Sequence, residues 1–325
     1  MNDSSFKLSM TAARQKFKKL SGHNNHYIIT CLVGLNGVKE GKVRKDPEFS
    51  TSWNPKDVTS SAMRSRNYVL HSSLVWIADL RDAYTEEVIR NELATNPEIF
   101  KEEDVSELGN IRGRRGKGDQ KGGRAEELKY LCKMLGIDDS ASQKAWLALV
   151  LASINLRNEF VHTFSTRTVD PDLKRRLTES KVYIHDNFNN LDVEILMKRW
   201  GRSYEENLSF KECLSYIQAT DKLVREIDNA ICTRILPDKK AESCLQNYFQ
   251  SFTRNGDKKN SAVINRKAQE IWGDSSSMTI KHLCKVLEQY HLQLNNEEGT
   301  YIREIASLSW EDAVSRFAIE PSAES

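Results

Sequence analysis

The sequence lacks the features that mark several common classes of protein. Its six cysteines lie far apart, with no C-x-x-C pair and no spacing typical of a zinc site. Neither sign of charge dominates, because 48 basic residues stand beside 46 acidic ones, so no global field draws nucleic acid or a membrane. The longest apolar run, Ala145–Ile154, covers about half the length that a membrane span requires. Residues Met1–Leu20 are polar and lysine-rich, without the apolar core of a secretory signal.

These absences exclude a secreted, membrane-spanning or zinc-finger protein. Cysteines that lie within apolar helical stretches behave as buried thiols in a reducing compartment. His23, His26 and Cys31 have a spacing that could ligate a metal, but the sequence offers them no fourth ligand. We therefore expect a cytoplasmic protein with no membrane segment, no bound metal and no cofactor.

What the sequence does contain is a helical pattern along most of its length. A hydrophobic fraction of 39% over 325 residues is enough to form a substantial core. Apolar residues recur at the spacing of amphipathic helices on both sides of the central region. We expect an all-α protein with an N-terminal arm (residues 1–57), an antiparallel helical bundle (58–237) and a small C-terminal helical subdomain (238–325).

Local signals delimit four helices in the bundle. The sequence predicts helices over Ser60–Asn91, over Arg124–Leu135, from Ser140 to Phe164, and from Ser209 to Leu236. Capping boxes mark the starts of two of these helices, at Ser140 with Gln143 and at Ser209 with Glu212. Gly136 is expected to end the second helix, because glycine readily adopts the left-handed backbone conformation found there. The segment before Gly109 and the segment Ser165–Leu208 are expected to be irregular, apart from one or two turns at Leu191–Trp200. Weaker patterns flank the bundle at Lys7–Leu20, Tyr27–Leu35, Leu245–Phe252, Val263–Trp272, Ile280–Tyr290 and Tyr301–Phe317.

The third bundle helix carries an unusual polar cluster. It is apolar around most of its circumference as far as Ile154 and then presents Asn155, Arg157, Asn158, Glu159 and His162. A core helix rarely holds so many polar side chains without a functional reason.

The segment Arg157-Asn158-x-x-x-His162 resembles the shared motif of the HEPN superfamily, an arginine usually followed by a polar residue, with a histidine four to six residues later. The resemblance covers the bundle, Ser60–Leu236, with the motif on its penultimate helix. It implies a homodimeric, metal-independent endoribonuclease, most often a toxin or an antiviral defence protein. Arg157, Asn158 and His162 would be its catalytic residues, and the products would be 2′,3′-cyclic phosphate and 5′-hydroxyl ends.

Helix geometry adds detail to this resemblance. Asn158 and His162 are four residues apart and share a face, so Asn158 can orient the imidazole. Arg157 and His162 point about 140° apart, which favours a composite site formed by two copies across a twofold axis. A second match, Arg66-Asn67-x-x-x-His71, lies near the start of the first helix. We favour Arg157 and His162 because their helix is the apolar one that precedes the closing helix.

A basic, glycine-rich stretch supplies candidate RNA contacts. Its cations are Arg112, Arg114, Arg115, Lys117, Lys121 and Arg124. They could clamp a phosphate backbone, although such a stretch is also typical of a solvated connection.

Other interpretations remain open at this point. The bundle could be a non-catalytic RNA-binding or dimerisation module, with Arg157 and His162 in structural roles. The C-terminal helices could instead bind a protein partner or regulator. Asp79 and Asp82 are expected to pair with Arg81 or with another cation of the bundle.

Overall fold

The computed structural model describes residues 4–43, 45–46, 48, 53–113, 123–161, 170–199, 208–252, 261–273 and 276–318. These residues are mostly helical, which confirms the all-α expectation, with one sheet of two three-residue strands as the exception. The chain forms two compact units. The larger comprises residues 13–227, and the smaller joins residues 1–12 to residues 228–325. Residues 13–57 of the expected N-terminal arm thus lie in the larger unit.

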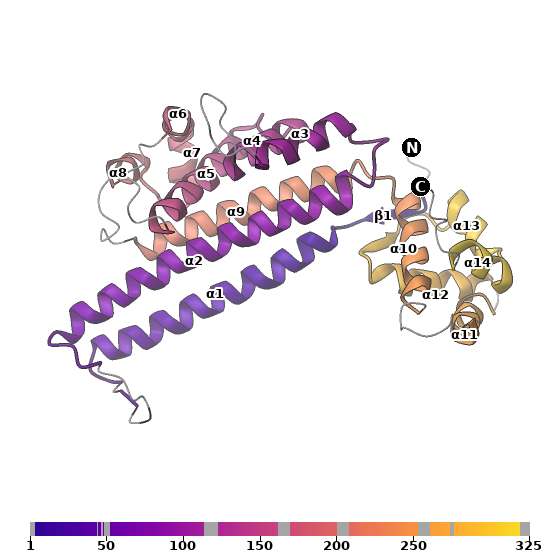
Figure 1. Ribbon diagram of the computed structural model, residues 1–325, viewed down its shortest axis with the longest axis horizontal. Coiled ribbons are helices and arrows are strands. Elements are labelled where there is room, and N and C mark those ends of the chain that lie inside the picture. The colour runs from indigo at the N-terminus through magenta and orange to yellow at the C-terminus, as the bar shows by residue number, and fades with distance from the viewer. Residues whose placement is uncertain are drawn as a thin grey trace. The chain divides into compact units, whose positions relative to one another are not determined.

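The larger unit is built from α-helices of very different lengths (Figure 1). In chain order they are α1 (Ala12–Lys39), α2 (Val58–Val88) with a π-helical turn (Ile89–Leu93), α3 (Glu102–Gly113), α4 (Arg124–Leu135), α5 (Ala141–Val161), α6 (Pro171–Glu179), α7 (Lys181–Asn187), α8 (Val193–Arg199) and α9 (Phe210–Cys232).

α1 is one continuous helix that runs antiparallel to α2. Phe17, near its start, meets Tyr84, near the end of α2, with ring centroids 6.1 Å apart. Further along, the Asn24 amide donates to the backbone carbonyl of Ser73 at 3.4 Å. The two N-terminal patterns noted in the sequence, Lys7–Leu20 and Tyr27–Leu35, thus lie largely in one helix. Polar residues between them continue the helix because Ser21 and Asn24 lie on its buried stripe.

α5 is the core helix of the larger unit. Every residue from Ala145 to Ile154 is buried, and the helix packs against α2, α4, α6 and α7. This packing explains why α5 is apolar around its circumference: neighbouring helices of the same chain cover it on several sides. Its start follows the expected capping box, in which the Gln143 N–H donates to the Ser140 hydroxyl and the Ser140 N–H donates to the Gln143 side chain, both at 3.2 Å.

Two other sequence signals are confirmed. At the start of α9, the Ser209 N–H donates to the Glu212 carboxylate at 2.7 Å and the Glu212 N–H donates to the Ser209 hydroxyl at 3.1 Å. α4 ends at Gly136, whose φ of +69° is the left-handed conformation expected of a glycine stop.

Two segments expected to be irregular are in fact helical. α3 occupies residues before and within the glycine-rich stretch, and α6 and α7 lie within Ser165–Leu208, whereas α8 falls where helical turns were expected, at Leu191–Trp200. α6 shows why the pattern was weak: only Leu173 and Leu177 are buried, so its apolar face is a single pair at i and i+4. Local polar contacts also support it. Asp170 accepts from the Asp172 N–H, and Pro171 occupies the first turn, where proline fits a helix.

The smaller unit contains short helices and the small sheet. Its helices are α10 (Pro237–Ser251), α11 (Ser261–Trp272), α12 (Ser276–Glu288), α13 (Thr300–Ala306) and α14 (Trp310–Phe317). β1 (Phe6–Leu8) pairs antiparallel with β2 (Leu292–Leu294), a sheet that the sequence did not predict. The single helix expected at Tyr301–Phe317 is divided, because Ser309 caps α14 by accepting from the Asp312 N–H.

Candidate functional site

The end of α5 is polar, as the sequence predicted, and its arginine is held in place by a neighbouring helix. Arg157 Nη2 donates to Oδ1 of Asp79 on α2 at 3.2 Å, and Nη1 donates to Oδ1 of Asn158 at 3.2 Å. The Arg157 side chain is 24% exposed. A guanidinium that is fixed by two contacts and still reaches solvent can meet a charged ligand without reorganising.

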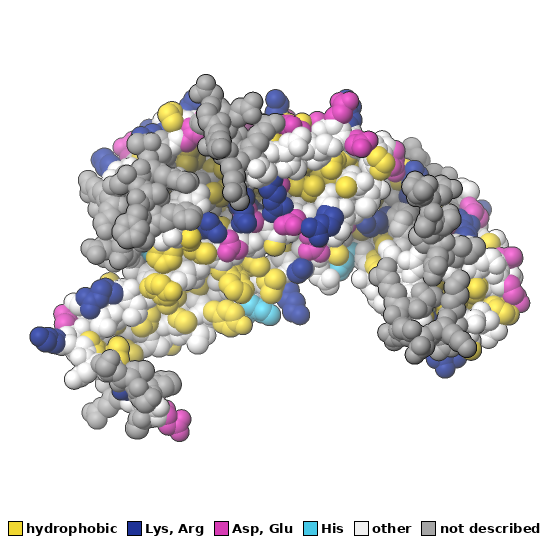
Figure 2. Space-filling model, in the orientation of Figure 1, with side chains coloured by type: hydrophobic (Ala, Val, Ile, Leu, Met, Phe, Trp, Pro, Cys, Tyr) yellow, Lys and Arg dark blue, Asp and Glu magenta, His cyan; other side chains and the backbone are white. Residues whose placement is uncertain are grey.

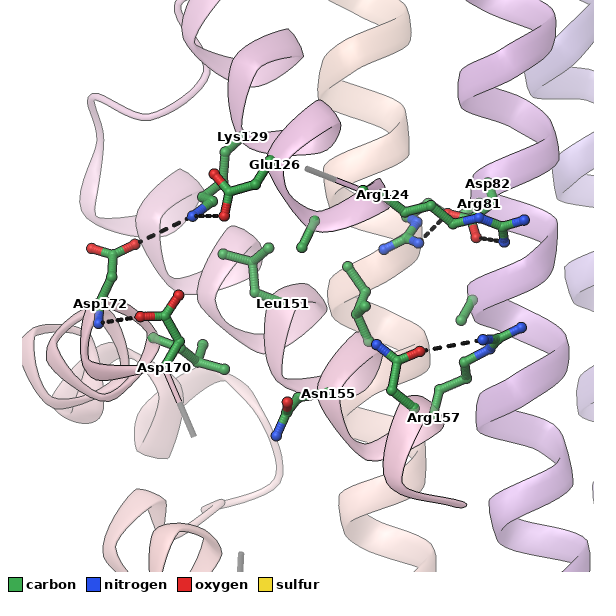
Figure 3. A pocket seen from close by; sticks show the side chains of 16 residues that line it. Arg81, Asp82, Arg124, Glu126, Lys129, Leu151, Asn155, Arg157, Asp170 and Asp172 are labelled. Atoms are coloured by element: carbon green, nitrogen blue, oxygen red, sulfur yellow. Dashed lines mark hydrogen bonds and ion pairs between the residues drawn. The ribbon is translucent and has the colours of Figure 1, made fainter. Parts of the chain in front are cut away.

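A pocket opens beside Arg157, with a volume of about 350 Å³ (Figure 3). It lies among α2, α4, α5 and the start of α6. Its polar lining is formed by Arg81, Asp82, Arg124, Glu126, Lys129, Asn155, Arg157, Asn158, Asp170 and Asp172. The volume falls at the lower end of the range of about 300–1,000 Å³ that small-ligand sites occupy.

One side of this pocket is an alternating row of charges. Asp79 interacts with Arg157 and, at 3.7 Å, with Arg124. Asp82 is within ion-pair distance of both Arg124 and Arg81. The expectation that Asp79 and Asp82 pair with Arg81 or another bundle cation is therefore confirmed. Asp79 itself is outside the pocket lining, so three arginines and one aspartate give the lining of this side a net positive charge.

Arg81 was expected only as an ion-pair partner, and its burial beside the pocket was not predicted from the sequence. Its side chain is 2% exposed, although arginine is rarely buried so completely. Its Nη2 contacts Asp82, whereas Nη1 has no hydrogen-bond acceptor among the described residues. The same is true of Nε of Arg157. Two buried guanidinium nitrogens, one from each arginine, therefore have no hydrogen-bond acceptor in the described part of the chain.

The opposite side of the pocket is acidic. Lys129 contacts Glu126 at 2.6 Å and Asp172 at 3.7 Å, and the Asp170 carboxylate caps α6. These carboxylates already have partners. The pocket is thus polarised, with arginines on the side of α2 and α5 and carboxylates toward α6 (Figure 3).

The candidate RNA-binding cations do not form one patch among the described residues. Arg124 lies in the pocket, whereas Arg112, at the end of α3, contacts Glu86 at 3.0 Å and Glu127 at 3.9 Å. Burial raises the pKa of Glu127, and Arg112 opposes that rise. The remaining four, Arg114, Arg115, Lys117 and Lys121, lie outside the described residues.

His162 also lies outside the described residues, so its expected alignment with Asn158 stays a prediction. The second motif copy is close to the same end of α5. The ring of His71 stacks on Phe160, with centroids 4.9 Å apart. Its Nδ1 lies 2.9 Å from the carbonyl oxygen of Asn67, and burial lowers the pKa of His71. His71 is therefore a neutral, buried ring at the contact between α2 and α5, and its Nδ1–H donates to Asn67.

The part of the chain that the structure describes holds neither a metal-binding cluster nor a membrane-spanning helix. Among the described residues, no three His, Cys, Asp or Glu side chains lie close enough together to hold a metal ion. No helix in the described ranges is long and apolar enough to cross a membrane.

Comparisons with known proteins found no match: the chain matches no family model, no curated protein and no solved structure.

Proposed function

We propose that the protein is a metal-independent endoribonuclease of the HEPN type, active as a cytoplasmic homodimer in toxin or antiviral defence. The observation that carries the proposal is the polar end of α5, where Arg157 and Asn158 follow the buried stretch Ala145–Ile154 and border a pocket with a positively charged side. Such a site suits the charge that develops on a phosphate in the transition state of RNA cleavage.

The proposed chemistry uses the nucleophile that RNA itself carries. His162 accepts the proton of the ribose 2′-hydroxyl as the 2′-oxygen attacks phosphorus. Arg157 neutralises the charge on the five-coordinate phosphorane, and Asn158 orients the histidine. The bond from phosphorus to the 5′-oxygen then breaks, and the leaving oxygen takes up a proton from the protonated histidine or from water, so the histidine can act as general base or as general acid. The products carry a 2′,3′-cyclic phosphate and a 5′-hydroxyl, so DNA, which lacks the 2′-hydroxyl, should remain intact.

An exposed apolar surface on α1 and α2 supports the homodimer (Figure 2). Tyr27, Val33 and Tyr68 are 62%, 66% and 65% exposed, and no charged residue lies between Lys19 and Lys39. A groove of about 420 Å³ is lined by Cys31, Gly34, Leu35, Ser65, Tyr68 and Val69. Isolated exposed apolar residues are ordinary, but a long helical segment without charge and with exposed apolar side chains, such as residues 20–38 of α1, is typical of an interface.

The surface is also self-complementary. Tyr27, Cys31 and Gly34 share one face of α1, at i, i+4 and i+7. Adding a Cβ at Gly34 would meet no atom within 4 Å, so the backbone there is open to an incoming side chain. A twofold axis near Cys31 would place Tyr27 of each copy against Gly34 of the other, which is the reciprocal contact of an isologous dimer.

Cys31 provides a test of this arrangement, because it is exposed whereas most of the cysteines are buried. Under mild oxidation, the wild-type chain should form a disulfide-linked dimer on a non-reducing gel, and Cys31→Ser should not. Cys284→Ser is the matched control and should cross-link like wild type. Light scattering should show that Tyr27→Asp weakens the dimer at low micromolar concentration. A monomeric wild-type chain, or equal cross-linking of Cys31→Ser, would contradict the proposed interface.

The basic stretch should contribute to RNA affinity. Replacing Arg114, Arg115, Lys117 and Lys121 together by glutamine should reduce the salt dependence of RNA binding, by up to about 0.7 in the logarithmic slope for each lost phosphate contact. The melting temperature should not change. The control replaces four exposed lysines of α1, α4 and α5 by glutamine: Lys18, Lys19, Lys133 and Lys144. Equal slopes for the two variants would show that the stretch does not contact RNA.

The alternative function is a non-catalytic module that binds RNA or dimerises, with its C-terminal helices available to a protein partner or regulator. A cleavage assay separates the two. The purified full chain is incubated with RNA and with DNA of the same sequence, both in EDTA. The nuclease should cut the RNA and leave the DNA intact, whereas a binding module should retain RNA without cutting it.

A further inference from the structure

Two buried guanidinium nitrogens at the pocket beside Arg157 need an acceptor. Nη1 of Arg81 and Nε of Arg157 are buried and have no hydrogen-bond partner among the described residues. Arg81 extends from α2 toward the pocket, with its other terminal nitrogen on Asp82 (Figure 3). Leaving a buried, charged donor unpaired is more costly than leaving a neutral one, so the arrangement favours a ligand that brings oxygen acceptors.

The start of α4 offers further donors to the same space. Gly123, Arg124 and Ala125 line the pocket, and no side chain caps the helix. The first backbone N–H groups of a helix have no partner within it, and they attract anions together with the helix dipole. Gly123 has a φ of +107°, a conformation that other residues rarely adopt, so the turn that delivers this helix start requires glycine.

Arg124 is the adaptable member of the site. Its side chain is 47% exposed, and its guanidinium contacts Asp82 and, at 3.7 Å, Asp79. A ligand could therefore recruit it without unfolding any element. Of the carboxylates in the first turn, Glu126 is paired with Lys129, whereas Glu127 lies 3.9 Å from Arg112 and its Oε1 has no hydrogen-bond partner among the described residues.

From these observations we infer that the pocket is a preformed phosphate-binding site. Its phosphate-binding groups are Nη1 of Arg81, Nε of Arg157, the N-terminal backbone of α4 and the half-exposed guanidinium of Arg124. That the bound phosphate is one of RNA rests on the proposed function, but the binding of a phosphate group does not. In this arrangement Arg81 and Arg124 are positioning residues for the phosphate, additional to the motif on α5.

The test titrates the full chain with inorganic phosphate at constant ionic strength, with chloride as the exchanged ion, and measures binding by calorimetry and by the rise in melting temperature. Saturable binding is expected. Arg124→Gln should weaken it at least tenfold while the unliganded melting temperature stays the same, since Arg124 is half-exposed. Arg266→Gln is the matched control, because Arg266 is an exposed arginine of α11 that, like its ion-pair partner Glu270, is outside the pocket lining, and the variant should bind like wild type.

Further variants and a second ligand make the outcome decisive. Arg81→Met should also lose phosphate binding; if it fails to fold, Arg124→Gln and Arg157→Gln carry the comparison. A non-cleavable 2′-O-methyl RNA should compete with phosphate in the wild-type chain and compete more weakly in Arg124→Gln. Absence of saturable phosphate binding, or equal affinity in Arg124→Gln and wild type, would overturn the inference. A chain that binds phosphate in this way but never cuts RNA would refute the proposed function and leave the phosphate site standing.

Discussion

Alanine at Arg157 or at His162 should slow RNA cleavage by at least about 100-fold, the usual effect of removing a general acid–base group or a charge-stabilising donor. The double variant should be little slower than either single one, because residues that act as one unit lose most of the rate at the first removal. The Arg157→Ala variant should still fold, because Asp79 keeps a second ion-pair partner in Arg124, 3.7 Å away. Single-turnover rates with a labelled RNA measure the effect, and RNA binding should largely remain.

The matched controls are the same residue types at the same spacing in α2. Arg66→Ala should cut RNA at the wild-type rate. His71→Ala should do so too, but it removes a buried ring that stacks on Phe160, so its rate must be compared at a temperature where the variant is folded. If the α2 pair abolishes cleavage and the α5 pair does not, the catalytic copy is the one in α2. Normal cleavage by all four single variants would refute both assignments.

The largest effect on stability is expected in the middle of α5. Leu149 is fully buried, so Leu149→Ala should lower the free energy of unfolding by about 2–5 kcal/mol through lost apolar contact and the cavity left behind. Urea denaturation of the full chain measures the change. Hydrogen exchange of the α5 amides should become faster in the variant, because this helix is the core of the larger unit.

A comparable substitution at the surface is the control. Ile195 on α8 is 46% exposed, and Ile195→Ala should change the free energy of unfolding by no more than about 0.5 kcal/mol. Equal destabilisation by the two substitutions would mean that α5 does not occupy the core, and the position of the polar site at its end would have to be reconsidered.

The helices with strong local signals were predictable from the sequence. The signals were the capping boxes at Ser140 and Ser209 and the left-handed glycine at Gly136. Each depends on contacts between residues close in sequence, so it does not depend on the surrounding fold. The β1–β2 pair was not predictable, because three-residue strands on opposite ends of the chain have no periodicity of their own to detect.

α6 could not be predicted from the spacing of apolar residues, because only Leu173 and Leu177 are buried. Arg176 contacts Asp172 and Asp138, both at 3.0 Å, and Arg175 contacts Asp172 at 2.6 Å. Charged side chains make several of its contacts, and in the sequence such residues resemble those of a solvated loop. The one available signal was Asp170-Pro171, a capping residue followed by a first-turn proline.

The candidate site was predictable only in part. Polar residues that interrupt a core helix pointed to Arg157 and Asn158, and that reasoning needed no tertiary information. Asp79, Arg81 and Arg124 come from α2 and α4, and their convergence depends on how those helices pack against α5. The burial of Arg81 could not be predicted, since an arginine in an amphipathic helix ordinarily faces solvent.

The chemistry of the cut ends tests the central claim most directly. The purified full chain is incubated in EDTA with an RNA of defined sequence, and the fragments are analysed by mass spectrometry. We predict a 2′,3′-cyclic phosphate on the upstream fragment and a 5′-hydroxyl on the downstream one, because the 2′-oxygen of RNA is the attacking group. Fragments with a 3′-hydroxyl and a 5′-phosphate, or RNA that remains intact in the presence of folded protein, would contradict the assignment of Arg157 and His162 to metal-independent RNA cleavage.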